Sequence, residues 1–189
     1  MMLKLLKART ACYFLLLMLF TSGSGKAQVC ASCPSFVKDP PPAVKNLASL
    51  AGCWVGKGPR GLAAKVTYEL GSDKTALLET IWIEKNPTMY TMYYRDGNVP
   101  MAHHFCSYGN QLQMKAEASD NPGILSFQLA GSSNLPNHDM NHVFSIKFTF
   151  LGADRFDVLW GLHHNGRDIP QLYHFTRVWN GCAQRSDEW

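Results

Sequence analysis

Histidine is the residue type in this sequence best suited to chemistry at neutral pH. The seven histidines are His103, His104, His138, His142, His163, His164 and His174. A neutral imidazole is a common ligand of metal ions and of haem iron. If His104 and His174 point into one cavity and His142 lies at its rim, they could hold such a group. Their spacing gives little support, because only His138 and His142 lie four positions apart. The sequence therefore predicts no cofactor, with haem or metal binding through His174 as the alternative.

Motifs for nucleophilic or phosphate chemistry are missing from the sequence. Neither Gly-x-Ser-x-Gly nor a Walker Gly-Lys-Ser/Thr string occurs. Asp154 and Asp157 are close in sequence, but we place them at a turn and on the polar face of a strand. No spacing indicates a catalytic pair, so the sequence leaves enzymatic activity uncertain and leans against it.

The N-terminus has the pattern of an export signal. Lys4, Lys7 and Arg9 precede an uncharged apolar run at 11–20, and a small and polar stretch follows as far as Ala27. This is the order of regions in a secretory signal peptide. The run is shorter than the about 20 apolar residues that a membrane span needs. We expect residues 1–27 to be removed and the product to be exported, to the periplasm or the medium, without a membrane span.

Removal of the signal also removes the excess of basic charge. The whole chain has 18 Lys and Arg against 14 Asp and Glu, and four of the basic residues lie within 1–27. The remainder is formally neutral, which argues against a basic surface for nucleic acid. Its length suits one domain. We expect a proline-rich tail at 28–42, a barrel domain at 43–182 and a C-terminal tail at 183–189.

Five cysteines remain after the signal. They are Cys30, Cys33, Cys53, Cys106 and Cys182. An exported protein can keep disulfides, and the simplest pairing joins Cys30 to Cys33 and Cys53 to Cys182. Spacing alone does not determine connectivity, and the Cys-x-x-Cys string could instead be a redox motif.

The hydrophobic rhythm changes from helical to strand-like after Gly52. Residues 43–50 favour a short helix. Alternating segments then predict ten strands, at 53–57, 62–70, 76–84, 88–95, 99–106, 111–117, 124–130, 142–150, 155–162 and 169–179. Turn chemistry such as Asp96-Gly97 and Asn165-Gly166 joins them. Such a meander removes its edges by closure, so we predict an all-β fold, a single antiparallel up-and-down β-barrel.

Alternation also predicts which side chains face the interior. Aromatic and methionine side chains would line a ligand cavity. These are Tyr90, Met92, Tyr94, Phe144, Phe148 and Trp160. A few polar groups would orient the ligand, namely His104, Gln111, Asn134, His142 and, in the haem alternative, His174. The polar segment 131–141 is a candidate rim or an ordinary surface loop.

The residues 52–58 spell Gly-x-Trp-x-Gly-x-Gly at the head of the first strand. This resembles the opening of calycin barrels: lipocalins share Gly-x-Trp, and nitrobindin-like haem barrels share the fuller pattern. The resemblance implies that Trp54 plugs the closed end as a core residue. Nitrobindin-like barrels bind haem through a histidine on a late strand, which His174 matches in approximate position.

A second resemblance covers about residues 47–179. The strings His104-Phe105-Cys106, Asn110-Gln111, Ser133-Asn134-Leu135 and 173–177 are similar to those of uncharacterised secreted lipocalin-like bacterial proteins. Leu112 stands where that group has proline, and Phe144 stands where it has a second histidine. This resemblance implies a fold and no activity.

The sequence thus favours an exported barrel that binds a small, largely apolar molecule in its lumen. Because this rests on fold analogy, three alternatives stay open. They are a haem- or metal-binding barrel with nitrobindin-like chemistry, a structural or partner-binding barrel with a filled core, and a hydrolase or isomerase on the same barrel. The oligomeric state is left open.

Overall fold

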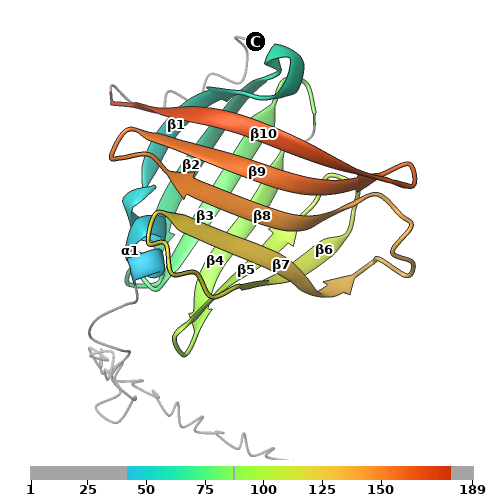
Figure 1. Ribbon diagram of the computed structural model, residues 1–189, viewed down its shortest axis with the longest axis horizontal. Coiled ribbons are helices and arrows are strands. Elements are labelled where there is room, and N and C mark those ends of the chain that lie inside the picture. Colours follow the sequence, from blue (N-terminus) through green and yellow to red (C-terminus); the bar gives the residue numbers. More distant parts are fainter. Residues whose placement is uncertain (1–41, 87, 180–189) are drawn as a thin grey trace, which may run out of the picture. The chain divides into compact units, whose positions relative to one another are not determined.

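Ten strands close into one antiparallel barrel (Figure 1). The computed structural model describes residues 42–86 and 88–179. Each strand pairs with its neighbours in sequence, and β1 pairs with β10 to close the barrel. The elements are α1 (Pro42–Ser49), β1 (Gly52–Lys57), η1 (Pro59–Gly61), β2 (Ala63–Gly71), β3 (Ala76–Ile83), β4 (Met89–Asp96), β5 (Val99–Phe105), β6 (Gln111–Ala116), β7 (Ile124–Ser133), β8 (His142–Phe150), β9 (Arg155–His164) and β10 (Arg167–Val178). The predicted all-β barrel with a short N-terminal helix is confirmed.

Several predictions concern segments outside the described residues. The signal peptide at 1–27, nearly all of the tail at 28–42 and the tail at 183–189 fall there, as do Cys30, Cys33 and Cys182. These remain predictions. No helix in the described part of the chain is long and apolar enough to cross a membrane.

Trp54 seals one end of the barrel together with α1. Its side chain is 1% exposed, and its indole Nε1–H donates a hydrogen bond of 2.7 Å to the carbonyl of Leu50, just after the helix. The Arg177 guanidinium lies 4.0 Å from the Trp54 ring centre and donates to the carbonyls of Ala51 and Ser49. The expected core role of Trp54 is confirmed.

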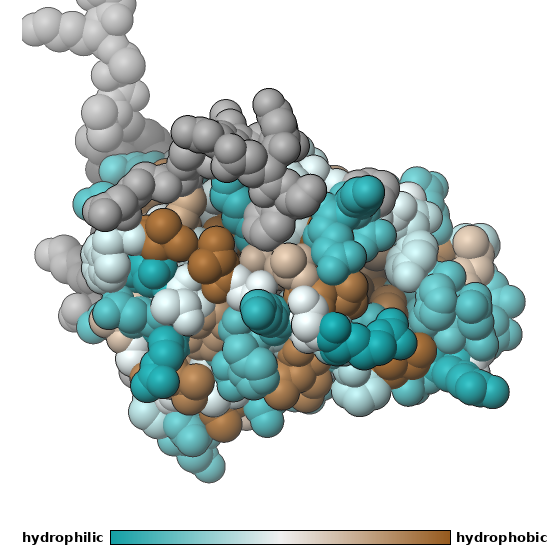
Figure 2. All heavy atoms as spheres, turned by 90° about the horizontal axis from the view of Figure 1, so that it is seen from above, coloured by the Kyte–Doolittle hydropathy of each residue, from teal (hydrophilic) through white to brown (hydrophobic). Residues whose placement is uncertain are grey.

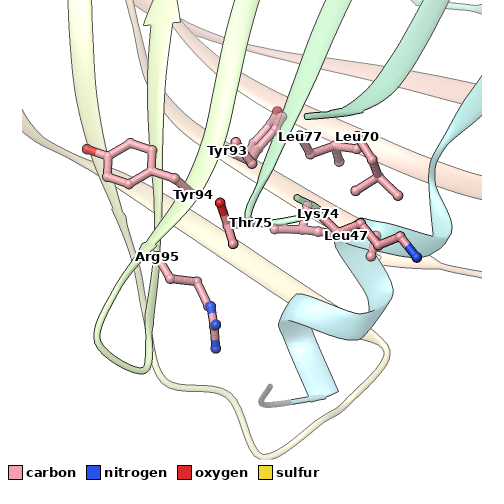
Figure 3. A pocket seen from close by; sticks show the side chains of 10 residues that line it. Leu47, Leu70, Lys74, Thr75, Leu77, Tyr93, Tyr94 and Arg95 are labelled. Atoms are coloured by element: carbon pink, nitrogen blue, oxygen red, sulfur yellow. The ribbon is translucent and has the colours of Figure 1, made fainter. Parts of the chain in front are cut away.

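The helix leaves little space where it meets the strands. In Figure 3, Leu47 of α1 lies beside Leu70 and Leu77, and the cavity between them has a volume of only about 30 Å³. That is room for roughly one or two water molecules. We call this the closed end.

The second and third glycines of the Gly-x-Trp-x-Gly-x-Gly string, Gly56 and Gly58, are explained by aromatic neighbours on β10. A Cβ atom at Gly56 would lie 2.6 Å from the ring of Phe175, and one at Gly58 would lie 2.2 Å from the ring of Tyr173. Real Cβ atoms do not approach other atoms so closely, so only glycine lets these rings pack against β1. The motif is therefore a packing device in this chain.

Aromatic side chains fill the middle of the barrel. Phe148 is fully buried, and its ring centre lies 5.8 Å from that of Tyr93, 6.5 Å from that of Phe127 and 6.0 Å from that of Phe156. These separations are typical of packed aromatic pairs. Phe148, predicted to line a ligand cavity, is instead part of the solid core.

The predicted face assignment of β4 is wrong by one residue. Met89, Thr91 and Tyr93 are buried in the interior, whereas Tyr90 is 47% exposed and Met92 and Tyr94 are half-buried on the opposite face. Both faces of this strand carry aromatic residues and methionine, so alternation alone did not distinguish them. Strand pairing determines which face of β4 is buried, because Thr91 lies opposite buried Glu79 on β3 and buried His104 on β5.

Phe144 also faces outward, for a different reason. A β-bulge interrupts the pairing of β8 with β9 between Val143 and Ser145. The Phe144 ring consequently lies over Gly161, where a Cβ atom would come within 2.6 Å of it. A bulge shifts the alternation by one residue, which the regular pattern did not anticipate. The outer surface seen in Figure 2 carries apolar residues in small groups separated by polar ones.

Candidate ligand-binding site

A cavity of about 310 Å³ lies inside the end of the barrel opposite α1. We call this the open end; the β9–β10 turn and the loop between β7 and β8 lie at this end in Figure 1. The lining residues are mostly apolar and come from β3, β4, β8, β9 and β10 and from segments that connect strands. They are Leu62, Ile83, Asn86, Met89, Cys106, Ser107, Tyr108, Val143, Trp160, Leu162, Gln171 and Tyr173. A cavity of this kind, apolar with a few polar groups, is typical of small-molecule sites.

Below this cavity the interior contains a buried carboxylate. Glu79 is 2% exposed and accepts hydrogen bonds from the hydroxyls of Tyr68 at 2.7 Å, Thr91 at 2.8 Å and Tyr93 at 3.1 Å. Burial raises the pKa of Glu79, and the three donors act in the opposite direction. Burial and the nearby Glu79 carboxylate raise the pKa of Tyr68 and Tyr93 well above the usual value, so both hydroxyls keep their protons.

His104 extends this network by one step. Its Nδ1 lies 2.9 Å from the Thr91 hydroxyl oxygen. Because the Thr91 hydroxyl donates its proton to Glu79, the imidazole Nδ1–H must donate to Thr91. The Nε2 atom then carries a lone pair, and it is buried without a hydrogen-bond partner in the described part of the chain. Burial lowers the pKa of His104 to about 4, so the ring is neutral at physiological pH.

Cys106 lies two residues after His104, just past the end of β5, and it lines the cavity. It is a free, buried cysteine. Burial raises its pKa above the ordinary value of a thiol, although backbone amides of Tyr108 and Ser107 partly offset this. Cys106 is therefore protonated at neutral pH. A protonated thiol is a poor nucleophile, so we expect this side chain to act as a small, weakly polar part of the cavity wall.

Of the predicted site residues, Trp160 lines the cavity and His104 lies in the interior. Trp160 is 5% exposed, and its ring centre lies 5.4 Å from that of Tyr173, which also lines the cavity. His104 is 2% exposed and is not among the residues that line the cavity. Phe148 is buried farther away, in the aromatic core.

Gln111, Asn134 and His142 lie near the open end but outside the cavity lining. The Asn134 side-chain amide donates to Gln111 Oε1 at 3.2 Å, and the Gln111 amide donates to the carbonyl of Gly109. His142 is buried against the ring of His163. These groups join loops at the rim, where His142 and the segment 131–141 were expected; none of the three lines the cavity, and their role in orienting a ligand stays a prediction.

His174 lies on the outer face of β10. Its side chain is 63% exposed, and its Nδ1 lies 2.8 Å from the Asp157 carboxylate. Alternation explains this, because the neighbouring Tyr173 and Phe175 are buried in the core. A haem held in the lumen would receive no axial ligand from His174. Tyr90, Met92, Tyr94 and Phe144 lie outside the lumen as well, for the reasons given above.

The Glu79 network was not predicted, although the sequence contains a signal for it. In β3 the inward positions are Leu77, Glu79, Ile81 and Ile83, so one carboxylate interrupts an otherwise apolar face. An acidic residue on a buried face is rare unless it is paired. Its partners on β2 and β4 depend on register, which the pattern alone does not supply.

Comparison with known proteins indicates the fold and nothing finer. No protein-family model matches the sequence, and no curated protein is similar to it. Among solved structures, Rv2717c from M. tuberculosis has a TM-score of 0.54 at 15% identity, over 75% of this chain and 100% of that one. A protein of unknown function of the DUF3598 family from Nostoc punctiforme has a TM-score of 0.46 at 12% identity, over 70% of this chain and 49% of that one. The ten-strand barrel fits a calycin-like fold.

Proposed function

We propose that this chain is an exported barrel protein that binds a small, neutral, largely apolar molecule in its open-end cavity. The observation that carries the proposal is the contrast in interior space. The open end contains a cavity of about 310 Å³, against about 30 Å³ at the closed end. At the closed end the side chains of the barrel and of α1 fill the interior, whereas at the open end they leave a mostly apolar recess of ligand size.

The chemistry of the cavity wall limits the class of ligand. Among the described residues that line it, none has a charged side chain. An ionic ligand would lose its hydration without gaining a counter-charge, at a cost of several kcal/mol. Ser107, Tyr108, Asn86 and Gln171 supply a few hydrogen-bonding groups, which suits a neutral molecule with one or two polar atoms. The volume is at the lower end of the range for ligand pockets, about 300–1,000 Å³.

Export is the other part of the proposal. It rests on the charged start, apolar run and small residues of segment 1–27. A barrel outside the cytoplasm would meet small apolar molecules at low concentration, and sequestration in a lumen is a reasonable use of this architecture. Metabolic chemistry is not required for this role.

Haem binding through His174 has no support from the geometry, because that side chain lies on the outer face beside Asp157. We therefore do not propose the nitrobindin-like alternative for this chain. A filled structural barrel remains the alternative that the binding experiment distinguishes.

The test uses N-phenyl-1-naphthylamine, a neutral apolar fluorophore with a single N–H donor. Purified protein should enhance its fluorescence saturably at one site, with energy transfer from Trp160, which lines the cavity. Val143→Phe places a ring in the cavity and should weaken binding at least about tenfold, a loss of roughly 1.4 kcal/mol. Val55→Phe is the matched control, because Val55 is 44% exposed on the outer face.

The two variants also separate binding from folding. Overpacking costs typically 1–3 kcal/mol, so the thermal unfolding of Val143→Phe must be recorded beside its affinity. Equal affinity of the two folded variants for the fluorophore, or no saturable binding by the parent protein, would remove the proposal. A filled structural barrel would then be the better description.

A further inference from the structure

A pair of histidines lies outside the lumen, where strands β8, β9 and β10 meet near the open end. His142 on β8 is opposite His163 on β9, and His163 is opposite Asp168 on β10. The ring centres of the two histidines are 5.5 Å apart, with 32° between the ring planes. Neither ring lines the open-end cavity, so this pair is separate from the proposed ligand site.

Hydrogen bonds determine the tautomer of both rings. The Nδ1 of His142 lies 2.7 Å from the carbonyl oxygen of Met140, and a carbonyl only accepts. The Nδ1 of His163 lies 2.7 Å from the Asp168 carboxylate, which also accepts. Each Nδ1 therefore carries the proton, and in the neutral rings each Nε2 presents a lone pair.

One of these lone pairs is buried without a partner. The Nε2 of His163 is inaccessible to solvent and has no hydrogen-bond partner within the described ranges 42–86 and 88–179. A buried acceptor without a donor costs about 1–3 kcal/mol. The neighbouring His142 does not relieve it, because its own proton is already donated to Met140. The Nε2 atom of His163 therefore lacks a donating or positively charged partner, and the ring of His142 is its aromatic neighbour.

A transition-metal ion meets this requirement. Histidines that bind metals usually donate the other ring N–H to a carboxylate or a backbone carbonyl, as both rings do here. Two imidazoles that share a tetrahedral ion at an Nε2 distance of about 2.0–2.1 Å have ring centres roughly 5 Å apart. The observed 5.5 Å is close to this separation.

The described residues supply two ligands and not a full set. No group of three or more His, Cys, Asp or Glu side chains in the described part of the chain is arranged to hold one ion. The ring of His138, in the loop between β7 and β8, packs against His142 with ring centres 5.9 Å apart. His138 is thus an aromatic neighbour of His142 and not a third ligand in the described structure.

We propose that His142 and His163 bind a divalent first-row transition-metal ion, such as Zn²⁺, through their Nε2 atoms. Asp168 and the Met140 carbonyl are positioning groups that keep both lone pairs available. Such an ion would join β8 to β9 next to the loop that borders the open end.

The test is a calorimetric titration of the full exported chain, without a purification tag, with zinc sulfate. Accessible thiols are alkylated first, so that cysteines do not contribute. We expect one site, and loss of either ring in His142→Ala or His163→Ala should lower the zinc affinity more than about 100-fold, beyond the roughly 10–100-fold effect of an outer-shell change. Asp168→Asn should lower it by roughly 10–100-fold.

The matched control is His174→Ala. His174 also bonds to a carboxylate, Asp157, at 2.8 Å, and it lies on the outer face. Its removal should leave the affinity unchanged. A spectroscopic readout guards against loss of folding: Co²⁺ bound to the parent protein should give visible absorption that both His142→Gln and His163→Gln abolish while their circular dichroism is retained. Equal effects of His163→Ala and His174→Ala, or undiminished Co²⁺ absorption in the glutamine variants, would overturn the proposal.

Discussion

The two ends of this barrel differ in how completely side chains fill the interior. At the closed end, the polar atoms of Trp54 and Arg177 meet backbone carbonyls, and about 30 Å³ is left unfilled. At the open end, a cavity of about 310 Å³ remains. Of four buried side-chain atoms without a partner in the described residues, three belong to His104, Asn110 and His163, on the open-end side. The comparison indicates that one end is closely packed and that the other contains the cavity in which we propose a ligand binds.

The first test of this difference removes the disulfide that we expect between Cys53, next to Trp54 at the closed end, and Cys182. Cys53 lies opposite Val178 in the β1–β10 ladder, and Cys182 follows four positions later in the sequence. A bond between residues 129 positions apart is worth roughly 4–5 kcal/mol in the chain-entropy treatment. Cys182→Ser should lower the free energy of urea unfolding by that amount under oxidising conditions. Peptide mapping without reductant must find the Cys53–Cys182 fragment, and another pairing would refute the assignment.

The second test compares one tryptophan from each end. Trp54→Ala should lower the free energy of unfolding by about 4 kcal/mol. It removes a fully buried ring, its hydrogen bond to the Leu50 carbonyl and its contact with the Arg177 guanidinium. Trp160→Ala should cost about 2 kcal/mol, since its ring already borders free space and mainly transfer energy is lost. Denaturant unfolding of both variants measures the difference. Equal losses would mean that the two ends do not differ in packing.

The third test measures how stability depends on pH through His104, which lies in the interior below the cavity. The pKa of His104 falls from an ordinary 6.5 to about 4 in the folded protein. The unfolded chain therefore binds more protons between these values, and stability rises with pH across this window. The contribution of neutral His104 is fully present above about pH 6.5 and is lost as pH falls toward 4, amounting to roughly 3 kcal/mol.

His104→Gln should flatten this dependence, and unfolding titrations at pH 4.5, 5.5 and 7 will measure it. The raised pKa of Glu79 acts in the opposite direction, because its folded form favours the proton and its contribution is lost as pH rises. The difference between parent and variant at each pH isolates the histidine. His174→Gln, at an exposed histidine, should leave the profile unchanged; a flat parent profile would contradict the assignment.

The smallest expected effect distinguishes the two faces of β4. Tyr93→Phe removes one donor from the buried Glu79 and should cost about 1–2 kcal/mol. Tyr90→Phe is the matched control on the outer face and should change stability by less than about 0.5 kcal/mol. Thermal unfolding resolves the difference. A larger loss for Tyr90→Phe would restore the opposite face assignment.

The sequence was sufficient for the architecture because turn chemistry and two-residue alternation are local signals. Asp96-Gly97 and Asn165-Gly166 fall at hairpins as expected, and the ten predicted strands match the observed ones within a few residues. Trp54 was correctly expected in the core. These features need no knowledge of distant neighbours.

The site was predicted less well, since it depends on pairing between strands. Tyr90 and Tyr93 look equally suited to a lumen until Thr91 is placed opposite Glu79. Phe144 faces outward because of a bulge in the pairing of β8 with β9. His174 faces outward because its neighbours Tyr173 and Phe175 point into the core. Trp160 was placed correctly because its strand has one clearly apolar face.

A crystal structure of the protein soaked with N-phenyl-1-naphthylamine tests the central claim most directly. We predict electron density for the two aromatic groups between Trp160 and Val143, inside the cavity at the open end. Density only on the outer face, for example in the hollow beside Trp82 and Tyr90, with the cavity holding nothing but water, would contradict the account.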